Sequence, residues 1–205
     1  MPENQLHGFT WEAEIKTTVF GLDVAAHYTA VHDIDRSHNR FDANENISIK
    51  TTGGSTVCMG DALRILDYEP GVLHTAIVVQ YEQCADSKVV VCVYELDLGQ
   101  RELLWGRVAR EEVSELDALV RSMPRGRRVP EIDAAITAKK NELNAKSGVL
   151  KFNPKIDSKT QRRLQCSIPK FADASGLVRT VARDPLVRGI PITASLPSGR
   201  RQRSR

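Results

Sequence analysis

A lysine and the acidic residues that precede it have the types and spacing that metal-dependent phosphodiester cleavage requires. Ser48 and Lys50 lie two positions apart in a strand-like segment, so their side chains share one face of it. The strand-like segment before them ends in Asp33-Ile34-Asp35. Clustered carboxylates hold Mg²⁺, and the reaction also needs a cation near the attacking water. An ammonium group in an apolar strand is costly unless it meets carboxylates, which favours a contact between Lys50 and one of these aspartates.

A helix and a hairpin must position these residues. Apolar residues near helical spacing predict a first helix over residues 8–20, which carries Glu12. Strands are predicted over residues 28–34 and 46–51, and the polar loop between them makes the pair a long-looped hairpin. The alternative is that Lys50 is an exposed residue of an edge strand and that the aspartates belong to the loop.

The rest of the chain predicts a sheet with helices around it. Residues 61–66 predict a short strand or helix, and two stronger strands are expected over residues 75–81 and 88–96. Two helices are predicted over residues 110–123 and 130–146, the second with Pro in its first turn. This order of elements predicts an α/β or α+β fold, in which helices flank a central mixed β-sheet.

The charge of the chain is divided between its two parts. Residues 1–120 hold 9 Lys and Arg against 20 Asp and Glu, a net charge of −11. Residues 121–205 hold 20 against 6, a net charge of +14. A segment this basic is typical of a nucleic-acid binder, and the alternative is a solvated basic tail. From residue 176 onward apolar residues are sparse and Arg is abundant, so residues 176–205 are expected to form a flexible tail.

The composition excludes several classes of protein. With 41% hydrophobic and 27% charged residues, the chain is neither collagen-like, nor a disulfide scaffold, nor wholly disordered. No window approaches 18 uninterrupted apolar residues, and the polar start lacks the pattern of a secretion signal, so we expect a cytoplasmic protein without a membrane segment. The cysteines contain no C-x-x-C pair, which argues against a structural zinc site. They are Cys58, Cys84, Cys92 and Cys166.

These residues together resemble the PD-(D/E)xK nuclease superfamily, which includes many type II restriction endonucleases. The resemblance rests on Gly8-x-x-x-Glu12 in a first helix, Asp33 or Asp35 at a strand end, and Ile49-Lys50 after a loop. It covers roughly residues 8–96, with a second segment at 150–170. It implies an Mg²⁺-dependent endonuclease that cuts double-stranded DNA, as a homodimer when both strands are cut. The alternative is a catalytically inactive nucleic-acid-binding protein with the same fold.

The sequence departs from the family pattern two positions before Lys50. Ser48 stands where the family usually has Glu or Asp. Some members with Ser there use a carboxylate from a segment about a dozen residues past the lysine, and Asp61 follows Lys50 by eleven positions. Glu12 is a second candidate for the missing acid. His32 or Ile34 also precedes the candidate aspartate, where the family often has Pro.

The resemblance assigns a role to each candidate residue. It implies that Asp33 or Asp35, together with Asp61 and the carbonyl of Ile49, holds Mg²⁺. Lys50 would then orient the attacking water or help to deprotonate it. The resemblance also implies a restriction-endonuclease-like domain over residues 1–175. Its core is expected at about 8–100 and its helical, basic DNA-binding part at about 108–172.

A basic segment near residue 160 is predicted to contact DNA. Ser158 and Gln161 form a capping-box pattern, so a helix is expected to begin near Lys159. Arginine reads guanine and glutamine reads adenine in the major groove, whereas lysine suits phosphates. The alternative is a solvated basic helix. The predicted DNA-binding residues are Lys155, Lys159, Gln161, Arg162, Arg163 and Gln165.

Overall fold

The structure of the chain is a computed structural model, which describes residues 3–23, 32–157 and 162–197. Among these residues it contains both helices and strands, and its central sheet is mixed and flanked by helices. The predicted α+β fold class is therefore confirmed.

The chain divides into two compact units. The first comprises residues 1–55, 71–99 and 177–205, and the second comprises residues 56–70 and 100–176. The chain therefore leaves the first unit after residue 55, returns at residue 71, leaves again after residue 99 and ends in the first unit. The sequence suggested a single domain over residues 1–175. The division differs from that suggestion, because residues 177–205 belong to the first unit.

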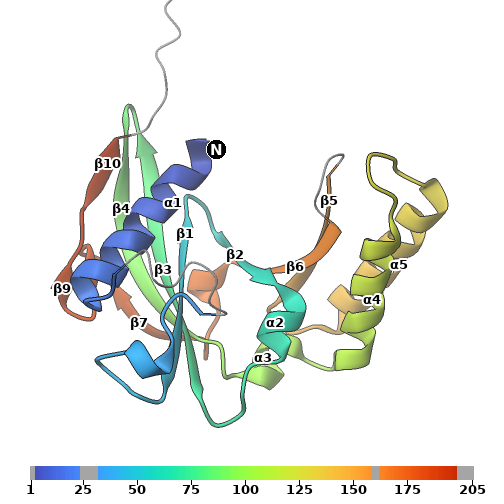
Figure 1. Cartoon of the computed structure of the whole chain (residues 1–205), viewed down its shortest axis with the longest axis horizontal. Coiled ribbons are helices and arrows are strands. Elements are labelled where there is room, and N and C mark those ends of the chain that lie inside the picture. The colour runs from blue at the N-terminus through green and yellow to red at the C-terminus, as the bar shows by residue number, and fades with distance from the viewer. Residues whose placement is uncertain (1–2, 24–31, 158–161, 198–205) are drawn as a thin grey trace, which may run out of the picture. The chain divides into compact units, whose positions relative to one another are not determined.

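The first unit contains the mixed five-stranded sheet (Figure 1). Strand β1 is parallel to β3, β3 is antiparallel to β4, and the far edge of β4 pairs with both β7 and β10. A separate two-stranded pair, β8 with β9, lies in the same unit. The strands are β1 (Glu45–Thr52), β3 (Leu73–Cys84), β4 (Ser87–Asp97), β7 (Val178–Ala182), β8 (Leu186–Val187), β9 (Ile190–Pro191) and β10 (Ser195–Pro197).

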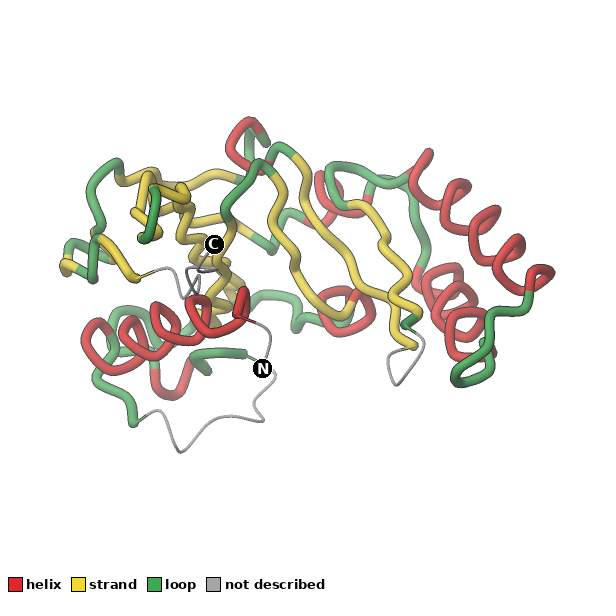
Figure 2. The backbone as a smooth tube through the Cα atoms, turned by 90° about the horizontal axis from the view of Figure 1, so that it is seen from above, coloured by secondary structure: helices red, strands yellow, loops and turns green. Residues whose placement is uncertain are grey.

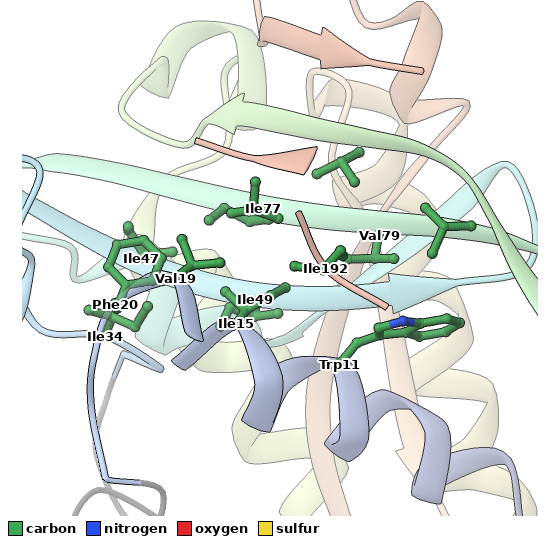
Figure 3. Packing of buried hydrophobic residues seen from close by; sticks show 13 residues of the cluster. Trp11, Ile15, Val19, Phe20, Ile34, Ile47, Ile49, Ile77, Val79 and Ile192 are labelled. Carbon is green, nitrogen blue, oxygen red and sulfur yellow. The ribbon is translucent and has the colours of Figure 1, made fainter. Parts of the chain in front are cut away.

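Helix α1 (Glu3–Glu14) and the π-helical turn that continues it (Ile15–Val19) cover one face of this sheet. Figure 3 shows Trp11, Ile15 and Val19 directed at the isoleucines and valines of the strands, and all three are fully buried. The Trp11 indole also donates to the Thr193 carbonyl at 2.9 Å, so its polar edge is satisfied in the core. The helix predicted over residues 8–20 is confirmed, and it begins earlier, at Glu3.

The predicted strands of the first unit are present. The strands expected over residues 46–51, 75–81 and 88–96 correspond to β1, β3 and β4, and β3 and β4 form a hairpin. Most of the strand expected over residues 28–34 lies outside the described residues. Its last residue, Ile34, forms an antiparallel bridge with Ile47 of β1.

The second unit is built on a three-stranded antiparallel sheet in the order β2-β6-β5. Two of its helices, α4 and α5, lie side by side, and α4 packs against β6 (Figure 2). Both helices match their predicted ranges closely. The elements are β2 (Thr56–Asp61), α2 (Ala62–Leu66), α3 (Arg101–Trp105), α4 (Arg110–Ser122), α5 (Pro130–Lys146), β5 (Lys151–Ile156) and β6 (Arg162–Pro169).

The C-terminal ends of α3 and α5 approach each other closely, and two glycines permit the contact. A Cβ atom on Gly106, which has a φ of +59°, would lie 2.6 Å from the carbonyl oxygen of Lys146. A Cβ atom on Gly148 would overlap the carbonyl group of Leu103. The backbone N–H of Val149 donates to the Leu103 carbonyl at 3.0 Å. Backbone therefore packs on backbone here, which leaves no room for a side chain.

The structure corrects the prediction for the end of the chain. Residues 178–197, expected as part of a flexible tail, contain strands β7 to β10, and residues 198–205 lie outside the described residues. Leu177 and Ile192 are buried beside these strands. A few buried apolar residues and paired arginines are enough to hold this segment against the sheet, although its composition is typical of a tail.

The helix predicted to begin near Lys159 is also wrong where the structure describes it. From Arg162 onward the chain is strand β6, which pairs with β5 over residues 162–167 and with β2 on its other edge. Leu164, Cys166 and Ile168 alternate along β6 and are buried, a period-2 pattern that overrides the capping signal. Residues 158–161 lie outside the described residues.

Candidate functional site

Asp33 and Lys50 form an ion pair beside strand β1. The carboxylate oxygen Oδ2 of Asp33 accepts from the Lys50 ammonium at 3.2 Å and from the backbone N–H of Ile49 at 2.6 Å. The same ammonium donates to the Ile49 carbonyl at 2.9 Å. Both side chains are partly exposed, at 25% for Asp33 and 19% for Lys50. The carboxylate, the carbonyl and the ammonium therefore lie within one another's reach, and the two side chains remain accessible from solvent.

The alternation of β1 explains this arrangement. Ile47 and Ile49 belong to the core cluster beneath α1, so Ser48 and Lys50 point to the opposite face of the strand. The bridge between Ile34 and Ile47 fixes the preceding segment alongside β1, which brings the Asp33 carboxylate to the Ile49 N–H. Ser48 is buried, at 4% exposed, in register with a residue of β3.

Asp35, the other candidate at the end of the first strand, has a different position. Its carboxylate caps the short 3-10 helix of residues 36–38 and accepts from the backbone N–H of Ser37 at 3.0 Å and from its hydroxyl at 2.8 Å. The backbone hydrogen bond from Ser37, followed by the hydroxyl bond, lowers the pKa of Asp35. The structure thus brings Asp33, and not Asp35, to Lys50.

Glu12 also forms an ion pair of its own. It accepts from the Lys16 ammonium at 2.6 Å, one turn further along the helix. No hydrogen bond or ion pair joins Glu12 to Asp33 or Lys50 in the part of the chain that the structure describes.

Asp61 belongs to the second unit, whereas Asp33 and Lys50 belong to the first. It ends β2, and its carboxylate caps α2 by accepting from the backbone N–H of Arg64 at 3.1 Å. An aspartate at this position is a favoured N-cap and therefore has a local structural role.

The first unit offers a small set of oxygen ligands for a divalent cation. They are the Asp33 carboxylate and the Ile49 carbonyl. Mg²⁺ binds proteins through one or two carboxylates and keeps several water ligands, so this donor set fits a hydrated Mg²⁺. Among the described residues, no three His, Cys, Asp or Glu side chains gather as they would around an ion held by protein alone.

A second cluster of charges lies on the first unit, and the sequence reasoning missed it. The carboxylate of Glu45 is 2% exposed and accepts from the Thr75 hydroxyl at 2.5 Å and from Arg188 at 2.8 and 2.9 Å. Arg188 also pairs with Glu95 at 2.9 Å. Arg179 pairs with Asp97 at 2.9 Å and approaches Glu45 at 3.7 Å. The cluster therefore ties β1 and β4 to the C-terminal segment.

The backbone and the surroundings of this second cluster are also distinctive. Arg188 adopts a φ of +52°, a left-handed conformation that is uncommon for residues other than glycine and that its ion pairs offset. Burial raises the pKa of Glu95, against the opposing effect of Arg188. Both residues line a cavity of about 330 Å³ whose other walls are mostly apolar. Acidic residues inside the apolar strands β1 and β4 are the signal that could have located this cluster.

The predicted DNA-binding residues divide between two faces of the second unit. Lys155, Arg163 and Gln165 share the face of the β5–β6 pair opposite the buried side chains, because Lys155 pairs with Arg163 across the strands. Arg162 points the other way and donates to the carbonyls of Arg121 and Met123 at 3.0 and 2.9 Å. Lys159 and Gln161 lie outside the described residues.

None of the described helices is long and apolar enough to cross a membrane. No family model matches the sequence, and neither a curated protein nor a solved structure matches it.

Proposed function

We propose that the chain is an Mg²⁺-dependent deoxyribonuclease of the type II restriction endonuclease kind, which hydrolyses phosphodiester bonds in double-stranded DNA. The observation that carries the proposal is the arrangement of Asp33, Lys50 and the Ile49 carbonyl beside β1. Two oxygen ligands, the Asp33 carboxylate and the Ile49 carbonyl, lie beside the ammonium of Lys50. Hydrolysis of a phosphodiester requires both metal ligands and a cation near the attacking water.

In this proposal Asp33 and the Ile49 carbonyl hold the metal, and Lys50 acts on the attacking water. Mg²⁺ supplies stabilisation of negative charge on the phosphate and on the leaving oxygen when it is bound. The ammonium of Lys50 orients the water by donating a hydrogen bond to it, or helps to remove its proton. Asp33 also positions Lys50, because its carboxylate holds both the ammonium and the strand that carries it.

The missing acid at Ser48 limits how many carboxylates the first unit supplies. Asp61 and Glu12 are the predicted replacements, and each has a structural partner of its own. The proposal therefore rests on Asp33 and Lys50, and the variants Asp61→Asn and Glu12→Gln test the two predicted contributions separately. Cleavage of both strands of a symmetric site would use two copies of the chain, as a homodimer.

A second function is favoured by Ser48 itself. A chain with one carboxylate beside the lysine can retain the fold and bind nucleic acid without cutting it. Incubation of plasmid DNA with the protein, once in Mg²⁺ and once in EDTA, separates the two functions. The nuclease proposal expects discrete fragments in Mg²⁺ alone. A salt-sensitive gel shift without fragments in either buffer would instead support the inactive DNA-binding protein.

Two matched variants connect such cleavage to this site. Asp33→Asn removes the carboxylate that contacts Lys50, whereas Asp35→Asn removes a charge two residues away and retains a side chain that can cap the 3-10 helix. We expect Asp33→Asn to lose cleavage and Asp35→Asn to keep it. Equal losses in both variants would mean that Asp33 has no special part in the reaction.

A further inference from the structure

A cavity lies on the first unit between β4, β7 and the β8–β9 hairpin. Its volume is about 330 Å³, which is at the lower end of the range for small-molecule sites. All the residues that line it belong to the first unit. Its walls are mostly apolar and include one acid and one arginine. The residues that decide its chemistry are Val93, Glu95, Thr180, Ala182, Leu186 and Arg188.

Glu95 lines this cavity with a carboxylate that lacks hydrogen-bond donors. Its side chain is 13% exposed, and Arg188 Nε lies 2.9 Å from it as an ion pair without the geometry of a hydrogen bond. Arg188 instead donates to Glu45. In the part of the chain that the structure describes, no other group donates to the Glu95 carboxylate. A largely buried carboxylate without donors is unfavourable, so a ligand that donates to it gains from the contact.

The charges around Glu95 favour a cationic ligand. Among the described ion pairs, the carboxylates of Glu45, Glu95 and Asp97 share the guanidinium groups of Arg179 and Arg188. Burial raises the pKa of Glu95, the two arginines oppose this effect, and Glu45 adds to it. A neighbouring cation favours the charged form of a carboxylate. Three carboxylates beside two guanidinium groups therefore favour a positive charge in the cavity and disfavour an anion.

Thr180 offers a second polar contact at the same wall. It lies directly across from Glu95 in the β4–β7 pairing, so the two side chains share one face of the sheet. Within the described residues its hydroxyl takes part in no hydrogen bond. Val93 and Ala182 form the next pair on this face, and Leu186 lines the same cavity. The cavity therefore has a polar end next to an apolar wall.

The turn that carries Arg188 is unusual for its sequence. Arg188 and Gly189 join β8 to β9 and have φ values of +52° and +77°. A two-residue hairpin turn with positive φ at both positions favours Asn-Gly, and arginine is strained there. The ion pairs with Glu45 and Glu95 offset this strain. Backbone strain of this kind is concentrated at ligand sites and switches, which agrees with a binding role for the cavity.

We propose that this cavity binds a small primary amine. The ammonium has three donors, which contact Glu95, Thr180 and water. The apolar chain of the amine lies against Val93, Ala182 and Leu186, a wall that a metal ion would leave uncovered.

This inference goes beyond the proposed function and does not depend on it. Glu95 is in register with Ile77 of the core cluster, so it lies on the face of the sheet opposite to Lys50. Amine binding and DNA cleavage can therefore be tested separately.

Titration of the isotope-labelled full chain with primary amines, followed through its amide NMR spectrum, tests the proposal. The series runs from propylamine to hexylamine. We expect saturable shifts in residues 180–189 and an affinity that rises about four-fold for each methylene group that the cavity buries. Pentanol and pentanoate are the neutral and anionic counterparts of pentylamine and should bind at least about 10-fold more weakly. Equal affinity for these three compounds would overturn the proposal.

Three variants separate the charge of the cavity from its shape. Glu95→Gln retains the size of the side chain and should lose at least about 10-fold in pentylamine affinity. Ala182→Leu fills the cavity without altering its charge and should abolish saturable binding. Glu82→Gln is the matched control, because Glu82 is exposed near the turn of the β3–β4 hairpin, and it should keep the wild-type affinity.

The amide spectrum of each variant also reports whether it is folded. No saturable binding of any amine by the wild-type chain would overturn the proposal, as would wild-type affinity in a folded Ala182→Leu. An equal loss in Glu95→Gln and Glu82→Gln would mean nonspecific attraction to negative charge and would also overturn it. Loss of amine binding would leave the cleavage proposal intact, and a chain that binds amines without cutting DNA would retain only the amine site.

Discussion

The Lys50 ammonium lies 3.2 Å from the Asp33 carboxylate and 2.9 Å from the carbonyl of Ile49. These three groups come from two chain segments, between which Ile34 and Ile47 form a β-bridge and the backbone N–H of Arg36 donates to the side chain of Asn46. A one-residue shift of either segment would turn these side chains to the other face. The register that buries Ile47 and Ile49 beneath α1 is therefore the same register that assembles the candidate site.

The buried carboxylate of Glu45 should depend strongly on Arg188. Arg188→Ala removes two hydrogen bonds from a carboxylate that is 2% exposed, so we expect the first unit to lose about 3 kcal/mol of stability. Arg183→Ala is the control, since Arg183 is exposed in the same segment. Trp11 lies in the first unit, so its fluorescence in a Trp105→Phe background reports urea unfolding of that unit. Equal midpoints in both variants would contradict the prediction.

Acid should weaken the second unit through Glu112. The hydrogen bond from the Lys146 ammonium, followed by that from the Ala109 backbone, lowers the pKa of Glu112. A lowered pKa in the folded state means that this contribution to stability is present above the ordinary value of 4.5 and is lost as the pH falls below it. Urea midpoints measured at pH 7 and pH 4 through Trp105 should differ less in Glu112→Gln than in wild type. The neighbouring Glu111→Gln should retain the full difference.

The close approach of α3 and α5 should not tolerate a methyl group. Gly148→Ala places a Cβ atom on the carbonyl of Leu103, and we expect a loss of about 1–3 kcal/mol from the displaced backbone. Gly54→Ala is the comparison, because a Cβ atom there meets no other atom within 4 Å. Thermal melting followed by circular dichroism checks both variants. An unchanged Gly148→Ala melting curve would mean that the two helix ends separate at little cost.

The sequence was sufficient for the elements whose periodicity is long and regular. Helices α4 and α5 carry an apolar stripe or clear end signals, and strands β3 and β4 are dense in valine. The contact between Lys50 and an aspartate also followed from local reasoning, because a charged group in an apolar strand needs a partner. Which aspartate it contacts depends on the bridge at Ile34, which no local pattern specifies.

The sequence misled where long-range pairing decides the structure. The capping signal before Arg162 favoured a helix, but pairing with β5 and burial of Leu164 and Ile168 favour the strand. The arginine-rich end resembled a tail because composition does not show that Arg179 and Arg188 meet acids from distant strands. The position of Asp61 in the other unit likewise depends on how the chain divides, not on its spacing from Lys50.

Lys50→Ala tests whether the Lys50 ammonium takes part in cleavage. The substitution removes the ammonium that would act on the attacking water, while the predicted DNA-binding residues stay in place. The measurement is the rate at which excess protein converts supercoiled plasmid to cut forms in Mg²⁺, with DNA affinity measured in EDTA. We expect cleavage by the wild-type protein, a loss of at least about 100-fold in the cleavage rate of Lys50→Ala, and unchanged DNA affinity. Cleavage by Lys50→Ala at the wild-type rate would contradict this expectation.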